Sequence, residues 1–151
     1  MVEYLQPTPQ HVTDVVEHLR AADRAELEAS GYPDPRRAIE LSLSISTHMI
    51  AACAGGRCGA LFGVAPASML AGVGVPWMLG TDLVVTHRRA LMAHAPAYIR
   101  SMLHAYPLLV NHVHAENALA VRWLRRAGFT LQPAAPHGPR GALFHRFELR
   151  A

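Results

Sequence analysis

Residues Asn117–Phe129 read NALAVRWLRRAGF. Apolar side chains recur at four-residue spacing, at Leu119, Trp123 and Ala127. Arginines occupy the opposite face, which is typical of a helix that lies on an apolar surface. Asn117 is a favoured N-cap residue, and Gly128 supplies the left-handed residue that ends a helix. The stretch therefore predicts a capped helix that packs on a sheet and continues directly into a strand at Phe129.

Length and composition indicate one globular domain, residues 1–151. The chain has 151 residues, of which 51% are hydrophobic and 17% charged, enough to bury a sizeable core. Glycine, proline and histidine break every apolar stretch before it is long enough to span a membrane. The N-terminal residues lack the basic and apolar regions of a signal peptide. We therefore expect a cytoplasmic protein without a membrane partner, with Cys53 and Cys58 reduced in the core.

Periodicity and turn residues predict an alternation of helices and strands, which indicates a mixed α/β fold. The predicted elements are a helix from Pro9 toward Ser30, a helix over 35–46, strands 47–54 and 58–64 around a Gly55-Gly56 turn, a buried strand 76–85, a helix 96–104 opened by Pro96, a strand 108–114, the helix after Asn117, and strands at 129–131 and 142–149. Loops are expected at 65–74, 87–94 and 133–141.

The late helix resembles a motif of the GCN5-related N-acetyltransferases, which reads N-x-x-A-x-x-(hydrophobic)-Y-x-x-x-G-F. The matching positions are Asn117, Ala120, Trp123, Gly128 and Phe129. Leu124 stands where that family places the tyrosine that protonates the departing coenzyme A thiolate. The resemblance implies a mixed, mostly antiparallel central sheet flanked by helices. It also implies a V-shaped split between the two central strands, here 76–85 and 108–114.

By the same resemblance, the chain is expected to be an acyl-CoA-dependent N-acyltransferase. An acetyl group would pass from acetyl-CoA directly to an amine in a ternary complex. Asp82 and His114, near the middle of the two central strands, are the candidate bases. The implied cofactor-binding residues are Leu83, Val84, Val85, Arg88, Arg89 and Asn117. The segment Thr86–Ala93 offers the arginine of the family's phosphate loop, R/Q-x-x-G-x-G/A, but neither of its glycines.

An alternative keeps the fold without the cofactor. Leu124, the missing glycines and Pro96 favour a catalytically inactive interaction or assembly protein. The chain resembles phage-encoded proteins of this fold, including internal virion proteins, which combine a recognisable late helix with an altered phosphate loop. In that case the protein is associated with a virion. Family members often pair through their last strands, so the resemblance also implies a possible homodimer.

Charge and histidine content leave the partner open. The formal net charge is +3, which suits anionic partners such as coenzyme A. The arginines are scattered and lack interleaved aromatic residues, so a nucleic-acid partner is not favoured. His112 and His114 share a strand face and could ligate zinc, but no third ligand is evident, so we expect no metal site. His137 and Arg140 give the loop 133–141 a basic character that would suit an anionic acceptor, although a solvated loop is the simpler explanation.

Overall fold

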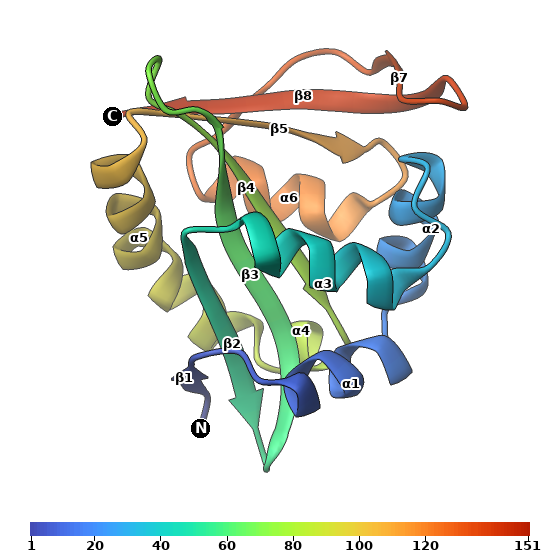
Figure 1. Ribbon diagram of the computed structural model, residues 1–151, viewed down its shortest axis with the longest axis vertical. Helices are drawn as coiled ribbons and strands as arrows, with labels where there is room; N and C mark the ends of the chain where they lie inside the picture. The colour runs from blue at the N-terminus through green and yellow to red at the C-terminus, as the bar shows by residue number, and fades with distance from the viewer.

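The computed structural model describes residues 1–151 and contains one eight-stranded sheet flanked by helices (Figure 1). In chain order the elements are β1 (Glu3–Leu5), α1 (Pro9–Glu17), α2 (Ala21–Ala29), α3 (Pro35–Ile45), β2 (His48–Ala54), β3 (Arg57–Ser68), β4 (Val73–Gly80), α4 (Leu83–Thr86), α5 (Arg88–Ala105), β5 (Leu108–His114), α6 (Ala118–Arg126), β6 (Thr130–Leu131), β7 (Ala135–His137) and β8 (Ala142–Arg150). The strand order is β1-β2-β3-β4-β5-β8-β6, and β7 also pairs with β8. All neighbours are antiparallel except β4 and β5, which confirms a mixed, mostly antiparallel sheet.

The two central strands separate soon after they meet. Only Val73 with Leu108 and Gly74 with Leu109 are paired between β4 and β5, although β4 runs on to Gly80. Figure 1 shows the two strands diverging from this end of the sheet. The V-shaped split implied by the resemblance is therefore confirmed.

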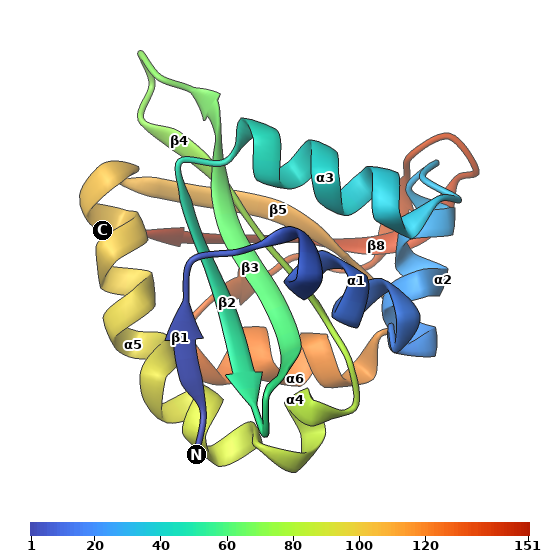
Figure 2. The ribbon, with the colours of Figure 1, turned by 60° about the horizontal axis from the view of Figure 1, so that its bottom comes forward.

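Two apolar clusters hold helices on opposite faces of the sheet. Helices α1 and α3 pack Val12, Val15 and Ile39 on β3 and β4. Helices α5 and α6 pack on the other face through a second cluster, which includes Tyr98 and Val121. Figure 2 shows α3 and α1 in front of the sheet and α6 behind it. Since the split lies between these two layers, it opens toward both.

Helix α2 is a separate element, so the predicted continuous helix from Pro9 toward Ser30 is wrong. The helix is interrupted between α1 and α2 because this segment pairs with the residue that follows β4: Leu19 forms an antiparallel bridge with Thr81. The Arg20 N–H also donates to the Gly80 carbonyl at 2.9 Å. These contacts turn α2 across the open end of the split.

The predicted buried strand 76–85 is wrong at its C-terminal end. β4 stops at Gly80, and Leu83–Thr86 forms the short helix α4. Thr81 is held by β3, since its N–H donates to the Gly59 carbonyl at 2.9 Å. Val84 then packs against the backbone of Gly80, where an added Cβ would lie 2.6 Å from its Cγ1 atom. A short apolar run does not by itself distinguish strand from helix, and here tertiary contacts select the helix.

Helix α5 passes through Pro96, so the predicted helix start at that residue is wrong. The helix spans Arg88–Ala105, 18 residues, and replaces the expected loop 87–94. An interior proline removes one hydrogen-bond donor and crowds the preceding turn, yet α5 continues on both sides of Pro96. The expected loop 65–74 is also shorter, because β3 extends to Ser68 and β4 begins at Val73.

The closed end of the split depends on a glycine. Gly74 lies under the ring of Tyr106, and an added Cβ would be 2.7 Å from Tyr106 Cγ and 2.8 Å from Val64 Cγ2. The Tyr106 hydroxyl is held by the Thr47 hydroxyl at 2.7 Å, so the ring has little freedom to move.

Gly74→Ala is therefore expected to lower the free energy of unfolding by about 2 kcal/mol through overpacking. Urea unfolding followed by circular dichroism measures this change. An unchanged unfolding midpoint would contradict the close packing at this end of the split.

Candidate active site

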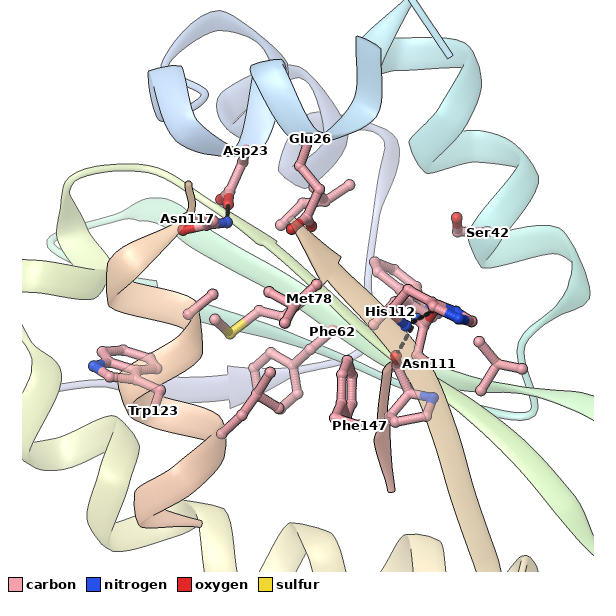
Figure 3. A pocket seen from close by; sticks show the side chains of 18 of the residues that line it. Asp23, Glu26, Ser42, Phe62, Met78, Asn111, His112, Asn117, Trp123 and Phe147 are labelled. Carbon is pink, nitrogen blue, oxygen red and sulfur yellow. Dashed lines mark hydrogen bonds between the residues drawn. The ribbon is translucent and has the colours of Figure 1, made fainter. Parts of the chain in front are cut away.

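A cavity of about 630 Å³ fills the split and reaches both helical layers. We call it the V cavity (Figure 3). Its α3 side is lined by residues that include Leu27, Ser42, Ile45, Trp77, His112 and His137. Its α5–α6 side is lined by residues that include Met92, Ala95, Tyr98, Ala120, Trp123 and Leu124. Most of the lining is hydrophobic, so each polar group that faces the cavity is a candidate for chemistry.

Two carboxylates project from α2 toward the V cavity (Figure 3). Asp23 and Glu26 are three residues apart and therefore share a helix face. Asp23 is 4% exposed. It accepts hydrogen bonds from the Gly80 N–H and the Asn117 side-chain amide, both at 3.0 Å, and forms an ion pair with Arg20 at 3.1 Å. Asp23 thus ties α2 to the end of β4 and the start of α6.

Glu26 stands at the open end of β5. Its Oε1 atom accepts a hydrogen bond from the His114 N–H at 2.7 Å. The pKa of Glu26 is raised to about 7: burial is the main cause, the His114 hydrogen bond opposes it, and the negative charge of Asp23 adds to the rise. A carboxyl group that titrates near neutral pH in a cavity has the properties of a general base.

Sequence reasoning missed this residue. The only signal was the pair of acids Asp23 and Glu26 at i, i+3 spacing, near the end of the helix expected from Pro9 toward Ser30. Nothing local indicates that the carboxyl group of Glu26 meets the backbone of residue 114. The structure thus adds Glu26 to the candidate residues.

The structure does not bring the predicted bases together in the V cavity. Asp82 is exposed at the start of α4 and does not line the cavity. His114 is 8% exposed, its ring lies 5.2 Å from that of Phe144, and its backbone N–H donates to Glu26. A role for either as the base stays a prediction. Leu83, Val84 and Val85 lie in α4, so the expected extended backbone at these positions is wrong.

The edge of β4 that faces the split is only partly paired. The Thr81 N–H donates to β3. Along an antiparallel strand, every second residue directs its N–H and carbonyl toward the partner strand, and the residues between direct theirs away from it. Pro76, Met78 and Gly80 therefore direct their backbone groups toward the split. The Pro76 carbonyl accepts a hydrogen bond from the Asn111 side-chain amide at 2.7 Å, which bridges the two strands.

Met78 is left as the open position on this edge. Both backbone groups of Gly80 are occupied, the N–H by Asp23 and the carbonyl by the Arg20 N–H. Met78 lines the V cavity, and neither its N–H nor its carbonyl bonds to β5, whose pairing with β4 ends at Gly74. An extended ligand in the split can pair with this donor and acceptor as another strand would.

The other predicted cofactor residues lie around the α5–α6 side. Arg88 and Arg89 occupy the first turn of α5, are exposed, and form no ion pair. The N-terminus of a long helix favours anions. Asn117 occupies the N-cap position of α6 as predicted, but its side-chain amide donates to Asp23 and makes no bond to the first turn of the helix. It is 1% exposed and lines the cavity. Leu124 also faces the cavity and offers no proton there.

The histidines form a stack rather than a metal site. The rings of His112 and His137 lie 3.6 Å apart and nearly parallel, at 7°. Burial lowers the pKa of His112, and the nearby His137 and Arg146 lower it further. No group of three or more His, Cys, Asp or Glu side chains is placed to hold a metal ion. The stack therefore presents an aromatic surface to the cavity, on which burial disfavours the charged form of His112.

Solved structures of several acetyltransferases share this architecture. A crystal structure of the ribosomal-protein-S18-alanine N-acetyltransferase from Escherichia coli superposes with a TM-score of 0.68 at 14% identity, covering 99% of this chain and 94% of that one. The aminoglycoside acetyltransferase AAC(6')-Ib, solved with coenzyme A, gives a TM-score of 0.70 at 14% identity, covering 99% and 95%. A GNAT-family acetyltransferase from Streptococcus pneumoniae gives 0.64 at 10% identity, covering 100% of both chains. The chain adopts the GNAT acetyltransferase fold.

Comparison of the sequence with known families and proteins does not identify a relative. No protein-family model and no curated protein matches the sequence. None of the helices is both long enough and apolar enough to cross a membrane. The GNAT fold of this chain thus rests on structure, and its activity has to be argued from its own residues.

Proposed function

We propose that the protein is an acyl-CoA-dependent N-acyltransferase that transfers an acetyl group directly to an amine. The observation that carries the proposal is the open V cavity, with Glu26 at one end and the unpaired backbone of Met78 on its edge. The crystal complex of AAC(6')-Ib with coenzyme A supports the choice of cofactor, because that protein shares the fold. Acetyl-CoA then enters from the α5–α6 side and the amine from the α3 side.

The residues present suit an acyl-pantetheine arm. The Met78 carbonyl is placed to accept an amide N–H, and the Met78 N–H to polarise a thioester carbonyl. The apolar side chains of α5 and α6 cover the arm, and Asn117 lies near its end. Arg88 and Arg89 hold phosphate groups at the start of α5 in place of a glycine loop. Leu83, Val84 and Val85 have no part in this arrangement.

Glu26 supplies the proton chemistry. It accepts a proton from the ammonium group of the acceptor, and the free amine then attacks the thioester carbonyl carbon. The new C–N bond forms as the C–S bond breaks, and the nitrogen releases its second proton to solvent water, which yields an amide and a thiolate. Water protonates the thiolate, because Leu124 cannot. Holding both reactants in one cavity supplies most of the remaining rate enhancement.

The arginine pair gives a test of cofactor binding. Arg88→Glu/Arg89→Glu is expected to weaken coenzyme A binding about tenfold or more, because two charge-assisted contacts to phosphate are lost. Isothermal titration calorimetry measures the dissociation constant. The matched control is Arg36→Glu/Arg37→Glu, an exposed arginine pair in the first turn of α3, which should bind as the wild type does.

S-acetylpantetheine serves as the second control in this experiment, because it lacks the phosphates. Both double variants should bind it equally. If the α5 pair and the α3 pair bind coenzyme A equally well, then the arginines do not form the phosphate site.

A second candidate is a cofactor-free interaction protein, such as a virion assembly component of the phage-like type. Two observations favour it: α5 occupies the segment where the glycine loop would lie, and Asn111 bridges the split where the strands diverge. A thermal-shift titration separates the two candidates. A ligand at a hundred times its dissociation constant stabilises a native protein by about 2.7 kcal/mol, so acetyl-CoA should raise the melting temperature only under the first proposal.

A further inference from the structure

Two acidic side chains line the α3 side of the V cavity, and one of them, Asp23, is paired with Arg20. Asp23 and Glu26 both line the cavity, whereas no arginine or lysine does. His112 stays neutral at pH 7 because burial lowers its pKa. Arg140, expected to suit an anionic acceptor, does not line the cavity. The electrostatics of this side therefore favour a cation over an anion.

The walls of this side are apolar and fixed in place. The Trp77 indole N–H donates to the Ser46 hydroxyl at 2.8 Å. The indole lies against Gly63, where an added Cβ would be 3.1 Å from the ring. Aromatic side chains held in this way form a pocket wall without further ordering on binding. The stacked His112 and His137 form a second wall from β5 and β7.

Aliphatic side chains complete the entrance. Leu41 and Ile45 of α3 line the cavity although they are 47% and 54% exposed. Leu27 of α2 lines it between this entrance and the carboxylates. Exposed aliphatic groups at the rim of a cavity mark a surface that an apolar ligand covers.

We propose that the acceptor is a primary amine with a single positive charge on an uncharged hydrophobic body. Its ammonium group lies at Glu26, and its body lies between Trp77 and the histidine stack, with its far end at Ile45. A second ammonium group would be buried among apolar side chains without a partner, which is unfavourable. A carboxylate beside the amine would face Asp23 and Glu26. This inference deepens the proposed function and rests on it.

A matched pair of amines tests the proposal. 2-Phenylethylamine and phenylalanine differ only by a carboxylate, and spermidine adds further ammonium groups. With acetyl-CoA and the full chain, thiol release should give a kcat/KM for 2-phenylethylamine at least about tenfold above that for either other amine. Equal or higher kcat/KM for phenylalanine or spermidine would overturn the proposed acceptor.

Direct binding keeps the two proposals distinguishable. Calorimetry with 2-phenylethylamine and phenylalanine is run with coenzyme A present and absent. Preferential binding of 2-phenylethylamine without any turnover would support the proposed amine site and contradict the proposed acyltransferase activity. Equal binding of both amines, or binding of neither, overturns the amine site whatever the acyl-transfer assay shows.

A charge placed at the rim gives an independent test. Ile45→Lys adds a cation at the entrance and is expected to raise KM for 2-phenylethylamine about fivefold, with kcat little changed, through like-charge repulsion. Ser44→Lys adds the same charge on the same helix at an exposed residue that does not line the cavity, so its KM should match the wild type. Equal KM values for the two variants would contradict the position of the amine body.

Discussion

Glu26→Gln is expected to lower kcat/KM for acetyl transfer by about 10³-fold, the usual contribution of a general base. Glutamine keeps an oxygen for the His114 N–H but cannot take up the proton of the acceptor. The change therefore removes the chemistry and leaves the hydrogen bond in place. Steady-state thiol release from acetyl-CoA with the best amine of the panel measures the loss.

The pH profile gives the same residue a second signature. Only ionised Glu26 accepts a proton, and its pKa is raised to about 7. We therefore expect kcat/KM to rise with pH around 7. It should then stay constant up to the pH at which the ionisation of the amine in solution becomes limiting. In Glu26→Gln the rise near pH 7 should disappear, whereas a merely structural role would lower activity and leave that rise in place.

The free energy of unfolding of Glu26→Gln should increase at alkaline pH, although its activity falls. The folded pKa of Glu26 lies above its ordinary value of 4.5, so the folded state favours the protonated carboxyl. This stabilisation is fully present below pH 4.5 and is lost as the pH rises through about 7. Glu26→Gln avoids burying the charge, and at pH 8 it should be more stable than the wild type by about 2 kcal/mol.

Three control variants separate Glu26 from the alternatives. Glu28→Gln changes an exposed acid on the same helix and should leave activity and stability unchanged. Asp82→Asn and His114→Ala test the two bases predicted from sequence. If either reduces kcat as much as Glu26→Gln does, and Glu26→Gln keeps the rise near pH 7, then Glu26 is not the base.

Asp23→Ala is expected to lower the free energy of unfolding by about 3–4 kcal/mol, because it leaves several buried groups without partners. The side chain is the shared acceptor for the Gly80 N–H, the Asn117 amide and Arg20. Alanine can replace none of these bonds. Denaturant unfolding followed by circular dichroism measures the loss.

Activity should fall in Asp23→Ala even at temperatures where the protein is folded, because α2 is no longer held across the split and Glu26 loses its position. Asp34→Ala provides the comparison, since Asp34 caps α3 at the surface through the Arg37 N–H. That variant should cost about 1 kcal/mol, the usual value of an N-cap. Equal losses in the two variants would show that the Asp23 network adds nothing beyond an ordinary surface bond.

The elements that the sequence determined by itself are those specified by local interactions. The late helix ends at Gly128 with φ of 101°, and the Gly55-Gly56 hairpin has φ of 59° and 78°. Helix α3 begins at Asp34-Pro35 as its N-cap and proline predict. Cap residues, glycine turns and apolar periodicity act within a few residues, so they can be identified without the rest of the fold.

The candidate active site was decided by contacts between distant segments. Leu83–Val85 is as apolar as a strand, yet it is helical because Thr81 is bound to Gly59. Glu26 acquires its raised pKa only because α2 is turned across the split and meets the backbone of residue 114, 88 positions away. Desolvation and pairing depend on which segments meet in space, whereas the sequence alone shows only which residues are neighbours along the chain.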